Sequence, residues 1–214
     1  ADAELAAEEM VKAVQLLMDT GGIEKLRITG GEPLLSPKFD SLLPAVMDLG
    51  LSDVSVTTNG QLLPRKADLV IKSGLQRINI SLDTLNPQHF RDIARSGDLA
   101  TVLQGIEQML VAGLGVKVNM VPMRHTNDDQ ILPMLAFCLE RGIELRFIEL
   151  MNMGHLQGNA LFNRQFFGMQ EILDLIATKY EFTRAEAPFD STAARFSIPG
   201  QGNFGIIANE SEPF

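Results

Sequence analysis

Two hydrophobic patterns alternate along the first 150 residues of the chain. Over residues 3–20 apolar side chains recur at spacings of three and four, which predicts an amphipathic helix. Short runs rich in β-branched and apolar residues predict strands over residues 25–30, 53–58, 77–83, 115–121 and 144–150. Helical patterns between them predict helices over residues 36–50, 64–73, 98–113 and 127–141, with a shorter one within 86–94. Ser36 is the expected N-cap of the first of these, with Pro37 at its first position.

This alternation of strand and helix, repeated about five times, predicts right-handed βα units and therefore an α/β fold with parallel strands. An open doubly wound sheet and a complete or partial barrel both satisfy that order. Polar residues inside the strands favour the barrel, because a sheet covered by helices on both faces would bury them against apolar side chains. Three sets of polar residues each share one strand face: Lys25, Arg27 and Thr29; Asn79, Ser81 and Asp83; Lys117 and Asn119.

The pattern changes after Met151, where the strict alternation of strands and helices ends. Residues 152–167 are rich in glycine and asparagine and are expected to form a loop, and residues 169–180 carry a helical pattern. Three short runs, 180–185, 194–199 and 204–209, predict antiparallel strands joined by turns. We therefore expect two domains, a βα barrel over residues 1–155 and a C-terminal α+β extension over residues 156–214.

Charge and composition narrow the classes of function. The 214 residues include 18 lysines and arginines against 27 aspartates and glutamates, a net charge of −9, so a nucleic-acid partner is not expected. No apolar run approaches the roughly 20 residues that span a bilayer, so no membrane partner is expected. The single cysteine, Cys138, lies in a helical pattern and is expected to be a small buried hydrophobic residue. One cysteine excludes a disulfide framework and a cluster held by this chain's thiolates alone, and the absence of disulfides agrees with a cytoplasmic protein.

Candidate chemistry begins at the end of the first strand, in the stretch RITGGEPLLS. Gly30 and Gly31 allow a ligand to approach the backbone closely, and the amides and carbonyls there can bind an ammonium or carboxylate group. Glu32 can accept hydrogen bonds from amides or meet a cation, and Pro33 restrains the exit from the turn. A simple tight turn remains the alternative. The stretches TTNG and SLD end the next two strands, and each can also be explained as a turn or a cap.

Four basic residues lie inside predicted strands, where lysine and arginine are rarely buried without a partner: Lys25, Arg27, Lys117 and Arg146. Directed into one barrel, their charges would repel each other unless an anion joined them. A triphosphate satisfies this requirement, and arginine offers bidentate geometry to its oxygens. The alternative is that the cations pair with carboxylates of the chain, namely Glu32, Asp83 and Glu149.

Several stretches together resemble a known family. GGEP after an early strand is typical of the radical S-adenosylmethionine (radical SAM) superfamily. The stretches LRITGGEPLL, VTTNGQLL, INISLDTL, VKVNMV, NDDQILPML, LRFIELM and FGIIANESEPF resemble the GTP 3′,8-cyclases of molybdenum cofactor biosynthesis across essentially the whole chain. The resemblance implies a partial (βα)6 TIM-like barrel of the radical SAM type. A βα barrel begins with a strand whereas this chain begins with a helix, so we expect its first strand to be missing.

The activity that the resemblance implies is a lyase reaction that converts GTP to (8S)-3′,8-cyclo-7,8-dihydroguanosine 5′-triphosphate. In this family a [4Fe-4S] cluster cleaves S-adenosylmethionine reductively, the resulting radical abstracts hydrogen from C3′ of GTP, and a second cluster holds the guanine. Contacts to S-adenosylmethionine are expected from Gly30, Gly31, Glu32, Asn59, Ser81 and Met151. Contacts to GTP are implied for Arg27, Thr57 and Lys117, and strand placement adds Lys25 and Arg146. No catalytic side chain and no metal ligand is expected within the chain.

The chain departs from the family at both cluster motifs. The cysteines of a C-x3-C-x2-C motif and those of the second cluster are absent from its 214 residues. We therefore expect a fragment or core of a longer protein, inactive by itself, whose small-molecule partners are GTP and S-adenosylmethionine; a homodimer is left open. Two alternatives remain, a cluster-free nucleotide-binding module and a different radical SAM enzyme such as a peptide-modifying one.

Overall fold

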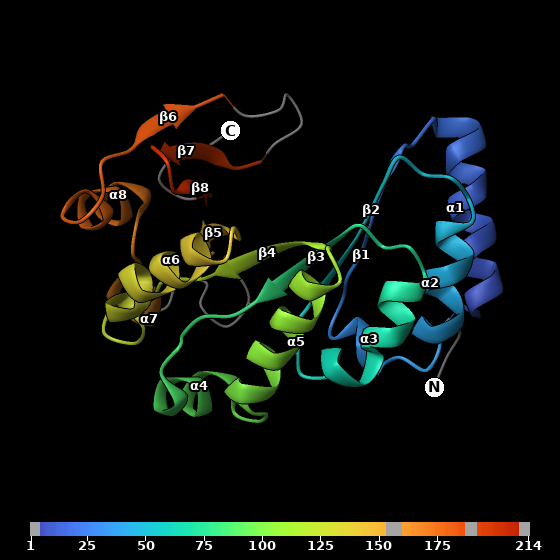
Figure 1. Cartoon of the computed structure of the whole chain (residues 1–214), viewed down its shortest axis with the longest axis horizontal. Coiled ribbons are helices and arrows are strands. Elements are labelled where there is room, and N and C mark those ends of the chain that lie inside the picture. The colour runs from blue at the N-terminus through green and yellow to red at the C-terminus, as the bar shows by residue number, and fades with distance from the viewer. Residues whose placement is uncertain (1–4, 153–159, 187–191, 210–214) are drawn as a thin grey trace. The chain divides into compact units, whose positions relative to one another are not determined.

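The computed structural model describes residues 5–152, 160–186 and 192–209, and the chain divides into two compact units. The first unit comprises Ala1–Ile80 and Ala100–Val116, and the second comprises Ser81–Leu99 and Lys117–Phe214. Each unit combines parallel strands with helices (Figure 1). The α/β class with mostly parallel strands, predicted from the sequence, is therefore confirmed.

The first unit is built on three parallel strands in the order β1-β2-β3: β1 (Lys25–Ile28), β2 (Asp53–Thr58) and β3 (Arg77–Ser81). Ile28 pairs with Val56, and Val56 pairs with Ile78, so one apolar row crosses all three strands. Val56 and Ile78 are fully buried. The alternation of side chains then places the polar residues of the same strands on the other face.

The helical elements of the first unit are α1 (Ala7–Gly21), the 3₁₀ helix η1 (Pro33–Leu35), α2 (Phe39–Met47), α3 (Leu63–Lys72) and α5 (Leu99–Val111). Figure 1 shows α2 and α3 on the same side of β1 and β2. Helices α5 and α3 pack closely, since a Cβ atom on Gly105 would lie 2.9 Å from Cβ of Leu63. Glycine at position 105 therefore sets the distance between these two helices.

The start of α2 differs from the prediction that Ser36 is its N-cap and Pro37 its first residue. The chain first forms η1, in which the Ser36 amide donates a hydrogen bond to the Pro33 carbonyl at 3.1 Å. The Ser36 carbonyl then accepts a hydrogen bond from the Phe39 amide at 3.0 Å, and α2 begins at Phe39 with Lys38 as its N-cap. The prediction is wrong because the GGEP turn continues into η1 and uses the backbone of Ser36 to end it.

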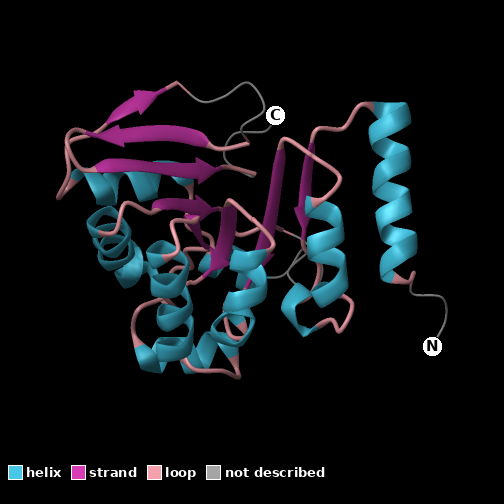
Figure 2. Cartoon of the chain, turned by 45° about the vertical axis from the view of Figure 1, so that its right-hand side comes forward, coloured by secondary structure: helices cyan, strands magenta, loops and turns pink. Residues whose placement is uncertain are grey.

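Among its described residues, the second unit has five strands in the order β4-β5-β8-β7-β6: β4 (Gly115–Met120), β5 (Glu144–Ile148), β8 (Gly202–Ile207), β7 (Ala194–Ile198) and β6 (Thr183–Ala185). Strands β4, β5 and β8 are parallel, while β8, β7 and β6 are antiparallel. Figure 2 shows the three C-terminal strands side by side, with helices on one side of them. The predicted antiparallel set is therefore correct except that β8 also joins β5 in parallel, because Phe204 and Ile206 extend the buried apolar face of β5.

The helices of the second unit are α4 (Pro87–Ala94), the 3₁₀ helix η2 (Asp128–Gln130), α6 (Ile131–Glu140), α7 (Ala160–Gln165) and α8 (Met169–Ala177). The core beneath the strands is aromatic: the rings of Phe196 and Phe204 stack at 5.1 Å, and Phe147 meets Phe204 edge to face at 6.3 Å. These contacts join β5, β7 and β8 into one apolar layer.

Helix α7 lies where the sequence predicts a loop over residues 152–167. Phe162 of this helix is buried, and its ring lies 5.3 Å from the ring of Phe166. Burial of these apolar side chains outweighs the glycine- and asparagine-rich composition that indicated a loop. Residues 153–159 of that predicted loop, residues 3 and 4 of the first predicted helix, and the last five residues of FGIIANESEPF lie outside the described residues.

Candidate functional site

The turn after β1 presents an accessible backbone at two glycines. Gly30 and Gly31 adopt φ angles of 108° and 48°, in a region that residues with side chains rarely occupy. A Cβ atom built on either glycine would meet no heavy atom within 4 Å. A ligand can therefore approach these peptide groups closely, as the sequence predicts for this turn.

Glu32 joins the ends of β1 and β2. Its Oε1 accepts hydrogen bonds from the Leu34 amide at 3.1 Å and the Thr58 hydroxyl at 2.7 Å, and its Oε2 accepts one from the Asn59 amide at 2.7 Å. The side chain of Asn59 shapes its own turn by accepting a hydrogen bond from the Gln61 amide at 3.0 Å. The carboxylate of Glu32 is thus engaged by the protein and holds the two strand-end loops together.

One face of the strands of the first unit is polar along its length. The register places Arg27 beside Ser55 and Thr57 beside Asn79, and residues paired in this way share a face. The polar residues of this face are Lys25, Arg27, Asp53, Ser55, Thr57, Arg77 and Asn79. Lys25, Arg27 and Thr57, which the sequence proposed as substrate contacts, therefore lie on one surface.

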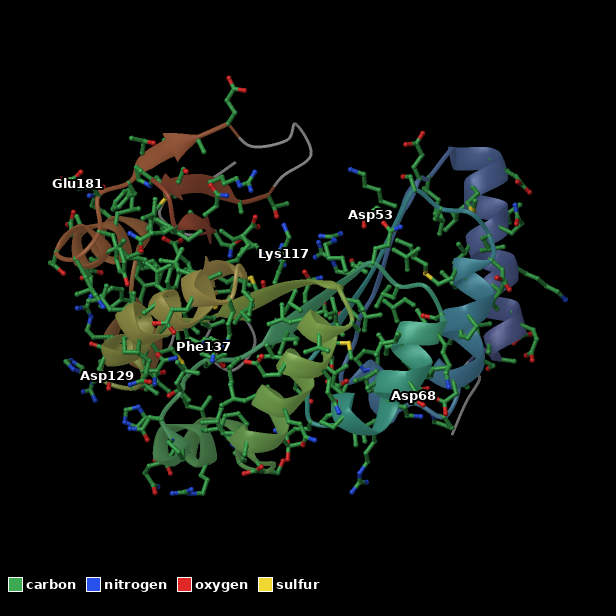
Figure 3. The ribbon with its side chains drawn as sticks, in the orientation of Figure 1. Asp53, Asp68, Lys117, Asp129, Phe137 and Glu181 are labelled. Atoms are coloured by element: carbon green, nitrogen blue, oxygen red, sulfur yellow. The ribbon has the colours of Figure 1, made fainter. Side chains whose placement is uncertain are left out.

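Two charges on this face neutralise each other. Arg77 donates two hydrogen bonds to Asp53, which is labelled in Figure 3, at 2.7 Å and 3.0 Å. Arg27 is exposed and forms no ion pair within the part of the chain that the structure describes. Thr57 accepts a long hydrogen bond of 3.4 Å from the Asn79 amide group. Arg27 and the Thr57 hydroxyl therefore remain able to contact an anion on this face.

The second unit carries its own basic strand face. The register pairs Lys117 with Glu144 and Asn119 with Arg146, so Lys117 of β4 (Figure 3) and Arg146 of β5 share one face. The ammonium of Lys117 donates a hydrogen bond to Glu144 at 2.8 Å. Lys117 is therefore paired, but with a carboxylate other than the three that the sequence analysis considered. Those three, Glu32, Asp83 and Glu149, all accept hydrogen bonds from backbone amides.

The strand ends of the second unit include the other two predicted cofactor contacts. Ser81 is the last residue of β3 and is exposed, and Met151 follows β5 with 44% of its surface exposed. Asp83 accepts a hydrogen bond from the Val121 amide at 2.8 Å. Burial raises the pKa of Asp83 above its ordinary value, and the bond from Val121 opposes that rise only in part.

Asn127 fixes the loop after β4. Its side-chain nitrogen donates hydrogen bonds to the carbonyls of Asp83 at 2.9 Å and Val121 at 3.0 Å, and its oxygen accepts one from the Met123 amide at 2.7 Å. It is the N-cap residue of η2 by position but makes no side-chain capping bond. The asparagine therefore supports the loops around Ser81 rather than a helix end.

The side chain of Glu149 is buried at the end of β5 and binds backbone amides there. The residue is 1% exposed, its Oε1 accepts a hydrogen bond from the Met169 amide at 2.7 Å, and its Oε2 accepts one from the Asn209 amide at 3.0 Å. Met169 begins α8, so the carboxylate lies at the positive end of that helix. Glu149 therefore ties α8 and the segment after β8 to β5.

The residues of this chain do not fit an iron–sulfur cluster. Such a cluster is held by several cysteine thiolates, and Cys138 is the single cysteine of the 214 residues. Cys138 is buried on α6, and burial raises the pKa of its thiol to about 12, which keeps it protonated. Among the described residues no group of three or more histidines, cysteines, aspartates or glutamates could hold a metal ion.

Sequence reasoning missed two residues of the basic face in the second unit, Glu144 and Arg195. The Oε2 atom of Glu144 lies 3.4 Å from Nη2 of Arg195 on β7. Arg195 alternates with Phe196 in the stretch ARFSIP, so period-two alternation could have identified an arginine opposite an apolar face. Nothing in the sequence alone indicates that β7 lies near β5.

Comparisons with known proteins find relatives of this chain. The sequence profile of the Radical SAM superfamily matches residues 1–138, and that of Molybdenum Cofactor Synthesis C matches residues 143–214. A protein named GTP 3′,8-cyclase from Sulfurovum sp. (strain NBC37-1) is 38% identical over 98% of this chain and 64% of its own length. Another of that name, from Synechocystis sp. (strain ATCC 27184 / PCC 6803 / Kazusa), is 35% identical over 90% of this chain and 58% of its own length. The chain thus spans less than two thirds of the length of these relatives.

Solved structures share the fold at lower sequence identity. Streptococcus suis SuiB bound to the precursor peptide SuiA superimposes with a TM-score of 0.68 at 18% identity, over 82% of this chain and 39% of that one. Coproporphyrinogen III oxidase from Escherichia coli, a radical SAM enzyme, gives a TM-score of 0.52 at 12% identity, over 94% of this chain and 56% of that one. At these identities the likeness concerns the fold. The profile match over residues 1–138, with which this fold agrees, shows that the chain belongs to the radical SAM superfamily.

Proposed function

We propose that this chain is the GTP- and S-adenosylmethionine-binding part of a radical SAM GTP 3′,8-cyclase of molybdenum cofactor biosynthesis, which forms (8S)-3′,8-cyclo-7,8-dihydroguanosine 5′-triphosphate. The observation that carries the proposal is similarity over 98% of the chain to a protein of that name. The match of residues 143–214 to Molybdenum Cofactor Synthesis C supports the same pathway.

The polar strand faces are the proposed substrate surfaces. In the first unit, Arg27 and Thr57 share a face with Lys25 and present a cation and a hydroxyl to phosphate or ribose oxygens. In the second unit, Lys117 and Arg146 share a face and present two further cations. Arginine and lysine side chains bind phosphate by charge-assisted hydrogen bonds, which suits a triphosphate.

The glycine turn is the proposed contact for the amino acid part of S-adenosylmethionine. Gly30 and Gly31 present backbone with no Cβ in the way, Glu32 and Asn59 shape the turn, and exposed Ser81 and Met151 are proposed as further contacts. When bound beside a reduced iron–sulfur cluster, S-adenosylmethionine supplies hydrogen-atom abstraction. The chain's own task is to bind and orient the two small molecules.

We expect the 214 residues alone to be inactive as a cyclase. The reductive step needs a cluster, and a chain with one protonated, buried cysteine cannot hold it. Four properties remain predictions: a barrel domain over residues 1–155, an extension over residues 156–214, a cytoplasmic location and a homodimer. Within the described ranges, no helix combines the length and apolar character that crossing a bilayer requires.

Isothermal titration of the chain with GTP tests the substrate. We expect GTP to bind more tightly than guanosine, and Lys117→Ala to weaken GTP binding by about tenfold to 100-fold, because a charge-assisted hydrogen bond is lost. Lys179→Ala, at an exposed lysine after α8, is the matched control and should leave binding unchanged. Equal affinity for GTP, guanosine and ATP would point to a general nucleotide-binding module. Binding of peptide but not GTP would point to a peptide-modifying enzyme.

Equilibrium dialysis with S-adenosylmethionine tests the glycine turn. Gly31→Val places a side chain over the turn and should abolish binding, because the backbone can no longer be approached. Gly50→Val is the matched control, since Gly50 is also exposed, has a φ of 76°, and has no heavy atom within 4 Å of a Cβ position. Both variants carry the same kind of backbone strain. Equal loss of binding in both, or in neither, would contradict the assignment.

A further inference from the structure

The basic face of the second unit extends further than its two proposed substrate contacts. Across the strands the register runs from Asn119 on β4 to Arg146 on β5, Gly205 on β8 and Arg195 on β7. Residues in one such row share a face, so Arg195 projects from the same side as Lys117 and Arg146. We call Lys117, Glu144, Arg146 and Arg195 the cationic face; its formal charge is three positive groups against one negative.

Glu144 holds two of these cations at once. Its Oε1 accepts the hydrogen bond from Lys117 at 2.8 Å, and its Oε2 lies 3.4 Å from Nη2 of Arg195. The side chains of Lys117, Glu144 and Arg195 are 27%, 21% and 37% exposed, so the three charges meet at a half-open surface. A single carboxylate thus bridges cations from β4 and β7, as one anionic group of a ligand would do.

Arg195 retains binding capacity in this arrangement. Its Nε atom is buried and has no hydrogen-bond acceptor among the described residues. A buried guanidinium donor without an acceptor costs free energy, and an anionic oxygen would relieve that cost. The neighbouring position in the row is Gly205, where a Cβ atom would lie 3.3 Å from Cγ of Arg146. The glycine therefore leaves the surface between the two arginines without a side chain.

We propose that Arg195 is a further phosphate-binding residue of this face, and that Glu144 is an internal counter-anion which a substrate phosphate group displaces from Lys117 and Arg195. The proposal rests on the proposed function, in which this face receives the triphosphate of GTP. Without ligand, Glu144 keeps both cations oriented and offsets part of their charge. With ligand, phosphate oxygens accept the hydrogen bonds from Lys117 and Arg195, and the charge of Glu144 then opposes binding.

The experiment measures dissociation constants for inorganic tripolyphosphate and for GTP by isothermal titration of the chain and its variants. Arg195→Ala should weaken both by about tenfold or more, because a charge-assisted contact is lost. Glu144→Gln should tighten both by about threefold to tenfold, because it removes a competing charge at a partly exposed site. The control is Arg184→Ala: Arg184 is exposed on the neighbouring strand β6 and is in register with Phe196 rather than Arg195.

A purely structural role for Arg195 predicts a different result. In that case Glu144→Gln would break the same pair without tightening binding, and Arg195→Ala would lower the urea midpoint without a selective loss of phosphate affinity. Either result, in a variant whose circular dichroism matches the parent, would overturn the proposal. If Lys117→Ala weakens GTP binding but Arg195→Ala does not, the substrate assignment stands and this inference fails. If the parent chain binds neither GTP nor tripolyphosphate, both fail together.

Discussion

Glu32 and Glu149 stand at the ends of strands in different units, and both accept hydrogen bonds from backbone amides of other segments. Glu149 is 1% exposed and binds the amides of Met169 and Asn209. Glu32 binds the amides of Leu34 and Asn59 next to the exposed Gly30–Gly31 turn. The bonding is alike but the surroundings differ. Around Glu149 water is excluded and the strand end is sealed, whereas beside Glu32 the backbone stays accessible.

This difference separates a sealed strand end from one whose backbone is open, which is the strand end proposed to bind a ligand. A carboxylate engaged by amides has little capacity left for a ligand, so in the proposed function Glu32 positions the loops and does not itself bind the cofactor. In the first unit, the proposed contact for a ligand is the backbone of the two glycines. In the second unit, Glu149 holds other segments to the end of β5. The contrast predicts that substitutions of individual carboxylates change the free energy of unfolding to different extents.

The largest effect is expected for Glu149→Ala. Removing the carboxylate leaves the buried amide of Met169 and the half-buried amide of Asn209 without an acceptor, so we expect a loss of about 3 to 5 kcal/mol in the free energy of unfolding. Urea unfolding followed by circular dichroism measures it. Glu149→Gln, which retains one acceptor oxygen, should lose less. A loss in Glu149→Ala as small as that in Glu32→Ala would remove the contrast between the two strand ends.

Glu32→Ala should destabilise the protein by about 1 to 2 kcal/mol, because water can reach the amide of Asn59, an exposed residue, although Leu34 is buried. Its main effect is expected on the loops: amide hydrogen exchange at Asn59 and Leu34 should accelerate, since both donate to the carboxylate. Glu32→Gln is the conservative partner and should show a smaller change. Unchanged exchange at both amides would show that Glu32 does not hold the loops.

The contribution of Asp83 to the stability of the fold should depend on pH. Burial raises its pKa in the folded state above the ordinary 3.8, so its favourable contribution is fully present below pH 3.8 and is lost as the pH rises through the raised pKa. Asp83→Asn should be more stable than the parent at neutral pH and equally stable in acid, since the amide oxygen still accepts from Val121. Urea unfolding at a series of pH values measures the difference. A difference that does not change with pH would contradict the cause given.

The smallest effect is expected for Glu171, an exposed carboxylate 2.5 Å from Arg124. The hydrogen bond from Arg124 lowers its pKa below 4.5, so its stabilisation is present above pH 4.5 and is lost as the pH falls through the lowered pKa. Because both groups are partly exposed, Glu171→Gln should cost less than about 1 kcal/mol at pH 7 and less still in high salt. A salt-independent loss as large as that of Glu149→Ala would reverse the ranking.

Much of the fold follows from local pattern, and the failures have two causes. The strand over residues 53–58 is observed as Asp53–Thr58, and the other four predicted barrel strands are observed within three residues of their predicted ends. The start of α2, the helix α7 and the parallel pairing of β8 with β5 were wrong or incomplete. At α7 and β8 the burial of Phe162 and of Phe204 outweighed local composition. At the start of α2 the neighbouring 3₁₀ turn η1 used the backbone of Ser36.

The sequence by itself determined the βα order, the polar and apolar faces of each strand, and the glycine turn, because periodicity and the missing Cβ of glycine are local properties. Only the tertiary structure decided which charges meet. Lys117 is 27 positions from Glu144, and Glu144 lies farther still from Arg195 in sequence, yet strand pairing brings the three side chains together. Hydrogen-bonded register between strands, not the order of residues, sets those distances, and a charge acts only over the few ångströms that register provides.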